Sequence, residues 1–152
     1  GTMLIVFGFV MLLAERVSRR DREIDTLEAR DAGVIGCAQA LALVPGVSRS
    51  GSTISAGLLM GFDRESAARY SFLLSVPAVV LSGLFELRHV GEGGGASAGA
   101  TALATLLAFV VGYASIAFLL RYLVRHSIAV FVAYRWVLGA LVIALAATNT
   151  IS

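Results

Sequence analysis

Long apolar runs alternate with short charged segments along the chain. The runs 66–87, 100–120 and 127–147 are each long enough to cross a bilayer as a helix, which takes about 20 residues. The run 1–14 would cover only about 21 Å as a helix, so we interpret it as the end of a spanning helix that begins upstream. The pattern predicts an all-α fold, a polytopic membrane helix bundle.

A further apolar stretch, 32–62, is interrupted in its middle. Its two parts, 32–44 and 51–62, are each too short to span, and Pro45 and Gly46 break the helix between them. This favours a re-entrant helical hairpin, in which one half-helix enters, a loop lies at membrane depth and a second half-helix returns. The alternative is a single kinked crossing of the same stretch.

The arginines predict an orientation. They concentrate in 15–31, 62–69 and 121–126, which a hairpin would place on one side, while the opposite side carries only Arg88 in the Gly-rich loop 88–99. Cytoplasmic segments of membrane proteins are enriched in Arg and Lys. We therefore expect 15–31 to be a cytoplasmic loop and the hairpin to enter from the cytoplasm. A single kinked crossing would divide the arginines between both faces.

Composition supports a membrane protein and excludes several other classes. Hydrophobic residues make up 58% of the chain and charged residues 14%, whereas a soluble domain of this size needs more polar surface. The net charge of +2, with mixed signs in each charged segment, gives no basic face for nucleic acid. A single cysteine, Cys37, allows no disulfide within the chain.

One arginine lies inside the interrupted stretch, in the sequence PGVSRSG. A charged arginine near the bilayer midplane costs about 2.5–3.5 kcal/mol on insertion scales, and a bound anion would offset that cost. The planar guanidinium of Arg49 can donate to two phosphate oxygens at once. The second half-helix points its free N–H groups at the same place. The hydroxyls of Ser48, Ser50, Ser52 and Thr53 add donors, while Gly46 and Gly51 let the backbone approach. These residues predict an anion cradle, with phosphate as the natural ligand.

Each of these polar residues also has a purely structural interpretation. Arg49 could pair with a carboxylate on another helix. Gln39, which precedes the break, could support the cradle or form an ordinary interhelical hydrogen bond. Arg135, about two turns into the last apolar run, is interpreted as snorkelling to the interface or forming an internal pair.

The stretch DAGVIGCAQALALVPGVSRSGSTISAGLLMGFDRESAARYSFLLSVPAVV, residues 31–80, resembles the second half of the undecaprenyl-diphosphate phosphatase family, the bacitracin-resistance type. The resemblance continues through YRWVLG at 134–139. It implies one half of an inverted-repeat fold in the bacterial cytoplasmic (inner) membrane. It also implies hydrolysis of undecaprenyl diphosphate to undecaprenyl phosphate, which recycles the lipid carrier of peptidoglycan synthesis. Arg49, flanked by Ser48 and Ser50, would bind the diphosphate and stabilise the charge that develops during phosphoryl transfer.

The resemblance also implies what this chain lacks. The other half of such proteins carries an acidic pair, a serine and a histidine that supply a divalent metal site (Mg²⁺ or Ca²⁺) and the nucleophile or base. No acidic residue lies between Asp31 and Asp63, so we expect the metal ligands to be outside this chain. The chain would then be a C-terminal fragment, inactive without an N-terminal half.

Two other functions stay open from the sequence. The first is a transporter or flippase of a polyprenyl phosphate or another anionic substrate, because secondary transporters also build midplane sites from broken helices. The second is a half-size module that completes its site as an antiparallel homodimer, which would bring two Arg49 residues together.

Overall fold

The computed structural model describes residues 1–86 and 98–148, and in these ranges the chain folds into helices. In order, they are α1 (Thr2–Val17), the 3₁₀ turn η1 (Ile24–Thr26), α2 (Ala29–Ala40), the 3₁₀ turn η2 (Leu41–Leu43), α3 (Arg49–Leu59), α4 (Arg64–Glu86), α5 (Ala98–Arg125) and α6 (Ala129–Ala147). The predicted all-α class is confirmed. The predicted Gly-rich loop, with Arg88, lies almost entirely outside the described residues.

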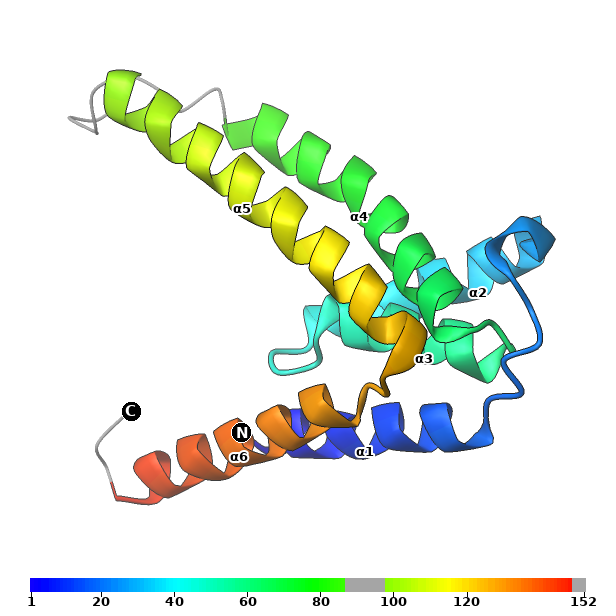
Figure 1. The fold of residues 1–152 in the computed structure, drawn as a ribbon. Coiled ribbons are helices and arrows are strands. Elements are labelled where there is room, and N and C mark those ends of the chain that lie inside the picture. The colour runs from blue at the N-terminus through cyan, green and yellow to red at the C-terminus, as the bar shows by residue number, and fades with distance from the viewer. Residues whose placement is uncertain (87–97, 149–152) are drawn as a thin grey trace.

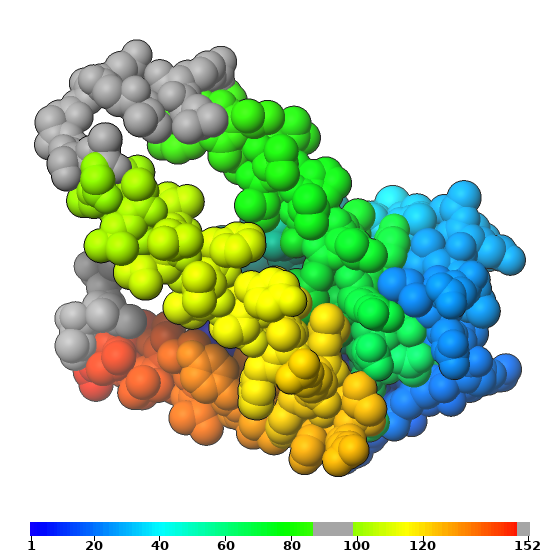
Figure 2. All heavy atoms as spheres, turned by 45° about the horizontal axis from the view of Figure 1, so that its top comes forward, coloured from blue at the N-terminus to red at the C-terminus, as the bar shows by residue number. Residues whose placement is uncertain are grey.

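The helices form two arms with a helical hairpin between them. Helices α4 and α5 pack together as one arm, and α1 and α6 pack as the other (Figure 1). Helices α2 and α3 pack against each other and are joined by a turn at 44–48, which lies between the arms (Figure 1). The outer part of α5 stands apart from α6 (Figure 2).

Within the searched residues, α4, α5 and α6 are long and apolar enough to cross a membrane. Large apolar side chains remain exposed along these helices, for example Leu106 at 59%, Phe109 at 70% and Val137 at 70%. Such a surface is unsuited to water and suited to lipid chains. The predicted membrane character is therefore supported by the helices themselves.

Close packing joins α1 to α6 and α3 to α4. A Cβ atom at Gly8 would lie 2.5 Å from the indole nitrogen of Trp136, and one at Gly57 would lie 3.0 Å from the Cβ of Ala67. The indole of Trp136 also donates to the carbonyl of Ile5, at 3.2 Å. Trp136 is therefore part of the α1–α6 contact.

Local hydrogen bonds explain where α4 begins. Gly61 has φ +90° and ends α3 in a left-handed turn. The carboxylate of Asp63 then accepts from the backbone N–H of Ser66 at 2.8 Å, which is an N-terminal cap. Backbone bonds between Arg22 and this turn, Arg22 N–H to the Gly61 carbonyl at 3.1 Å and Asp63 N–H to the Arg22 carbonyl at 2.9 Å, tie the loop after α1 to the start of α4.

The observed helix ends differ by a few residues from the predicted ranges. Helix α1 runs on to Val17, and α2 already begins at Ala29, so the segment 15–31 is helical at both ends. The N–H of Glu28 donates to the carboxylate of Asp31 at 3.1 Å, which supplies the helix start that the apolar pattern did not reveal. Whether the hairpin is re-entrant in a membrane stays a prediction.

Candidate functional site

The predicted anion cradle coincides with the N-terminus of α3. Ser48 is the N-cap residue: its Oγ accepts from the N–H of Gly51 at 3.2 Å, and its carbonyl accepts from the N–H of Ser52 at 2.9 Å. An α-helix leaves its first N–H groups without intrahelical acceptors. The amides of Arg49 and Ser50 are therefore the ones left to meet a ligand. The N–H groups of Gly51 and Ser52 already have acceptors on Ser48.

Two glycines shape this helix start for different reasons. Gly46 has φ +94°, and a Cβ there would lie 2.9 Å from the Cβ of Met3. Gly51 is helical, but its Cβ would lie 3.1 Å from the Cβ of Ser48 and 3.2 Å from the sulfur of Met11. Gly46 thus allows the turn, and Gly51 allows α3 to begin closely packed on α1.

The guanidinium of Arg49 is exposed and has no ion pair or hydrogen bond to another of the described residues. It lines a cavity of about 270 Å³ beside the α2–α3 turn, which we call the loop cavity. The loop cavity is lined by Leu4, Ala42, Val44, Pro45, Gly46, Val47, Ser48, Arg49 and Arg135. The alternative in which Arg49 pairs with a carboxylate has no partner within the described part of the chain.

Arg135 joins this site from α6, and the sequence analysis missed it. It is only 8% exposed, and its Nη2 donates to the carbonyl of Gly46 at 2.7 Å. Its Nε is buried and has no hydrogen-bond partner. Arg135 therefore does not snorkel to the interface; it reaches a backbone carbonyl of the turn and keeps donor capacity free. The available signal was one arginine inside an apolar span, which usually marks a functional site.

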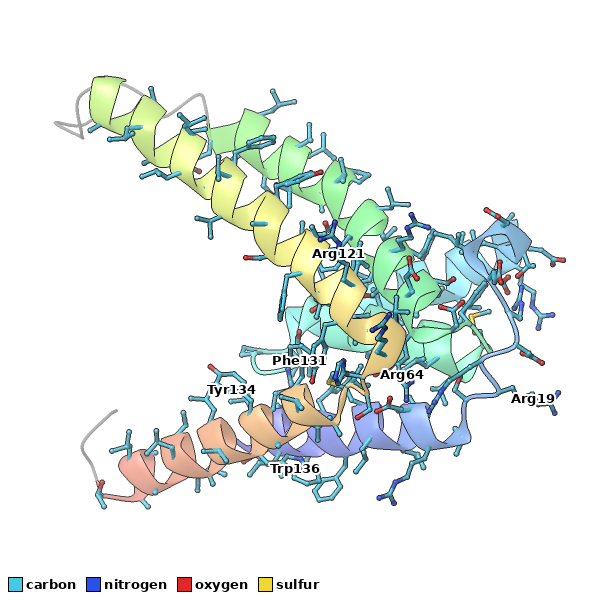
Figure 3. All side chains as sticks on the ribbon, viewed as in Figure 1. Arg19, Arg64, Arg121, Phe131, Tyr134 and Trp136 are labelled. Carbon is cyan, nitrogen blue, oxygen red and sulfur yellow. The ribbon has the colours of Figure 1, made fainter. Side chains whose placement is uncertain are left out.

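A second cavity, which we call the apolar cavity, adjoins the other side of Ser48 and Arg135. Its volume is about 220 Å³, and it is lined by Met11, Ser48, Ser50, Gly51, Ile54, Leu119, Leu123, Ile128, Phe131, Tyr134 and Arg135. Phe131 and Tyr134 point from α6 toward the hairpin, whereas Trp136 points away toward α1 (Figure 3). Donors thus gather where the two cavities meet, and apolar side chains surround one of them.

The remaining predicted residues are close in sequence but line neither cavity. The hydroxyl of Ser52 donates to the Arg49 carbonyl at 2.9 Å, and that of Thr53 lies 2.6 Å from the hydroxyl of Ser71 on α4. These hydroxyls stabilise α3 and its contact with α4. Gln39 is absent from both linings, and its Oε1 is buried without a partner.

The hydroxyls of Ser48 and Ser50 do face the site. Their Oγ atoms lie 3.1 Å apart, and both residues line the apolar cavity. Arg49, Arg135, Ser48 and Ser50 therefore form a cluster of side-chain donors at one helix N-terminus. Such a cluster can bind an oxyanion and stabilise negative charge.

The divalent metal expected in the full-length protein has no candidate group of ligands among the described residues. No group of three or more His, Cys, Asp or Glu side chains in these ranges lies close enough together to hold a metal ion. The cluster beside Arg49 consists of cationic and hydroxyl groups, which are poor ligands for Mg²⁺ or Ca²⁺.

The chain is similar to known proteins of one family. Residues 1–141 match the protein family described as bacitracin resistance protein BacA. An undecaprenyl-diphosphatase of Mycolicibacterium gilvum (strain PYR-GCK) is 52% identical over 156 residues, which cover 100% of this chain and 56% of that protein. Undecaprenyl-diphosphatases of Mycobacterium ulcerans (strain Agy99) and Mycobacterium tuberculosis (strain ATCC 25177 / H37Ra) are each 54% identical, over 100% and 99% of this chain respectively and 56% of each relative. The chain thus spans about half the length of the curated relatives it matches.

Proposed function

Because the chain belongs to the bacitracin resistance protein BacA family, we propose that the full-length protein is a membrane phosphatase that converts undecaprenyl diphosphate to undecaprenyl phosphate. Its relatives carry the name undecaprenyl-diphosphatase. The proposed reaction is hydrolysis: water adds to the terminal phosphorus, the bridging P–O bond breaks, and the lipid monophosphate leaves with its electron pair. This chain would supply the side of the site that binds the diphosphate.

The observation that carries the proposal is the juxtaposition of donors and apolar surface. A polyprenyl diphosphate has an anionic head and an apolar chain. Arg49 and Arg135 lie beside the loop cavity, while Leu119, Leu123 and Phe131 line the adjoining apolar cavity. A ligand with this same division of chemistry would match both cavities.

In the proposed mechanism Arg49 makes the main contact with the diphosphate. Its planar fork can donate to two phosphate oxygens at once, which a point charge cannot do. Ser48, Ser50 and the free amides at the start of α3 would complete the contacts. Negative charge grows on the leaving oxygen as the anhydride bond breaks, so fixed donors at that place lower the barrier.

A divalent metal, Mg²⁺ or Ca²⁺, would neutralise part of the diphosphate charge when bound. We propose that its ligands, and the group that activates the attacking water, lie in the part of the protein outside this chain. The isolated chain would then be inactive. Self-completion as a homodimer is the competing arrangement, and it would bring two Arg49 clusters together without acidic ligands.

For the membrane arrangement, we propose a multi-pass protein of the bacterial inner membrane with α2 and α3 as a re-entrant hairpin, one half of an inverted repeat. The turn at 44–48 between two arms supports this arrangement, as does the length of α4, α5 and α6. Arginines at the ends of α1 and α5 and the start of α4 would face the cytoplasm.

The test is release of inorganic phosphate from undecaprenyl diphosphate by the full-length protein. We expect Arg49→Ala to lower turnover by at least about a hundredfold, the scale found for loss of a donor to a developing oxyanion. Arg19→Ala is the matched control, because it removes a charge that points away from the body (Figure 3). A loss of less than about tenfold in Arg49→Ala would remove Arg49 from the catalytic role.

A transporter or flippase is the second candidate, and the hairpin between two arms is the observation that favours it. Proteoliposomes distinguish the two candidates in two assays. With labelled undecaprenyl phosphate, a transporter would move the label between leaflets and a phosphatase would not. With undecaprenyl diphosphate, a phosphatase would release inorganic phosphate.

A further inference from the structure

Glu15, in the last turn of α1, is a buried carboxylate that the proposed mechanism does not use. It is 4% exposed and lines neither the loop cavity nor the apolar cavity. A buried carboxylate is costly unless donors surround it. Its contacts therefore show what the fold requires at this position.

The donors to Glu15 come from two other helices. The backbone N–H of Ile128, the N-cap residue of α6, lies 3.3 Å and 3.2 Å from the two carboxylate oxygens. Arg64, the first residue of α4, forms an ion pair with Oε1 through its Nε. In Figure 3 Arg64 lies beside the connection between α5 and α6. One carboxylate thus joins the end of α1 to the starts of α4 and α6.

Fixing Ile128 determines which face of α6 is turned inward. Ile128, Val132, Arg135 and Gly139 are all buried and follow a helical spacing. A slip of one residue would rotate the helix by about 100° and take Arg135 away from the Gly46 carbonyl. Because a carboxylate also stabilises a helix N-terminus, Glu15 is suited to hold this register.

Arg64 connects the same carboxylate to the other side of the site. Helix α4 packs on α3, through Gly57 against Ala67 and through the Thr53–Ser71 hydrogen bond. The Glu15 carboxylate thus contacts the starts of both α4 and α6. Through α4 it positions α3, and through α6 it positions Arg135.

We propose that Glu15 is a positioning residue, which sets the register of α6 on α1 and so holds Arg135 at the turn between α2 and α3. The proposal deepens the proposed function and rests on it. Glu15 does not touch the substrate; it acts through Ile128 and Arg64.

Glu15→Gln is the direct variant. A glutamine keeps one acceptor oxygen, but it replaces the other with an NH₂ donor and carries no charge. The ion pair with Arg64 and the contact between Oε2 and the Ile128 N–H are therefore lost. We expect kcat/KM for undecaprenyl diphosphate to fall by about tenfold in the full-length protein. Arg64→Gln removes the same ion pair from its other partner and should also lower kcat/KM. Glu65→Gln, at a neighbouring carboxylate whose side chain is 40% exposed, is the matched control and should change kcat/KM by less than twofold.

A double-mutant cycle with Arg135→Ala separates positioning from general structural damage. If Glu15 acts through Arg135, Glu15→Gln should cost less than about twofold once Arg135 is already alanine. An equal loss in both backgrounds would overturn the proposal, as would no loss in the wild-type background.

A readout independent of activity distinguishes failure of this inference from failure of the proposed function. Trp136 is the one tryptophan of the chain and contacts α1 through Ile5 and Gly8. The fluorescence difference between each protein and its Trp136→Phe counterpart isolates its emission. We expect the emission maximum to shift in Glu15→Gln and to stay unchanged in Glu65→Gln. An unchanged maximum in Glu15→Gln would contradict the inference even if the protein is a phosphatase.

Discussion

Arginines in two regions of this molecule have different partners. In the loop after α1 and at the start of α4, arginines pair with carboxylates: Arg22 with Asp31 and Arg64 with Glu15. The Arg22 guanidinium also lies 4.3 Å from the ring centre of Phe62. The hydrogen bond from Arg22 lowers the pKa of Asp31 below its usual value. The positive charges of Arg22 and Arg64 are thus neutralised within the chain.

At the α2–α3 turn, by contrast, two arginines lie beside cavities without a carboxylate partner. Arg49 has no ion pair with another described residue, and Arg135 hydrogen-bonds only to a backbone carbonyl among them. The chain places two cationic groups next to apolar surface. It provides neither of them with an ion-pair partner in the described ranges. The difference teaches that the paired arginines hold the fold together, whereas the second region, in our proposal, binds a negative ligand from outside.

The largest effect should come from giving the site a carboxylate of its own. Ser50→Asp would place a negative charge beside Arg49 and Ser48, where we propose the diphosphate binds. Phosphate release should fall by more than about a hundredfold, although an acid in the first turn stabilises a helix by about 0.3–1 kcal/mol. The control is Ser50→Asn, which has a similar shape without the charge and should lose much less. Equal losses in the two variants would show that charge is not the cause.

Arg135→Lys tests whether Arg135 acts through the paired N–H donors of its guanidinium or only through its positive charge. Lysine keeps the charge but not the planar donors. We expect kcat/KM for undecaprenyl diphosphate to fall by about tenfold, and by more in Arg135→Ala. If kcat/KM of Arg135→Lys equalled that of the wild type, the role of Arg135 would be limited to its charge.

Gly46→Ala tests the turn that precedes Arg49 and accepts the hydrogen bond from Arg135. A Cβ at φ +94° is strained and would approach Met3 to 2.9 Å, so we expect the free energy of unfolding to fall by about 1–3 kcal/mol. Gly36→Ala is the control, because nothing lies within 4 Å of its Cβ inside α2 and alanine favours a helix. Thermal unfolding in detergent should show a lower midpoint for the first variant and no loss for the second.

The smallest effect should come from the paired region. Because Arg22 holds the pKa of Asp31 below the ordinary 3.8, ionised Asp31 stabilises the fold above that value and loses this contribution as the pH falls through its folded pKa. Unfolding midpoints measured between pH 3 and 6 should therefore decline at the acid end. Asp31→Asn should be less stable than the wild type near pH 6 and show a shallower acid decline. Identical pH profiles would mean that the pair contributes nothing measurable.

The apolar pattern predicted the all-α class and the three membrane-length helices of the described residues, because run length is a local feature of the sequence. It missed the helix starts that depend on single hydrogen bonds, such as the one from Glu28 to Asp31. The residues of the site that lie in one motif, Ser48 to Gly51, were predictable because a helix N-terminus is also local.

Tertiary contacts account for what the sequence left undetermined at the site. Arg135 reaches Gly46 only because α6 packs on α1, and no short motif contains both residues. Ser52 and Thr53 illustrate the converse: they belong to the motif, but their hydroxyls are directed to helix carbonyls and to Ser71. Side-chain direction, more than spacing, decided which residues face the cavities.

The most direct test of the central claim is equilibrium binding of a non-hydrolysable polyprenyl methylenediphosphonate to the full-length protein. We predict that Arg49→Ala weakens binding by at least about tenfold, the scale of one lost charge-assisted contact, while Arg19→Ala binds like the wild type. Equal affinity of Arg49→Ala and the wild type would contradict the claim that the unpaired arginine at the α2–α3 turn holds the diphosphate.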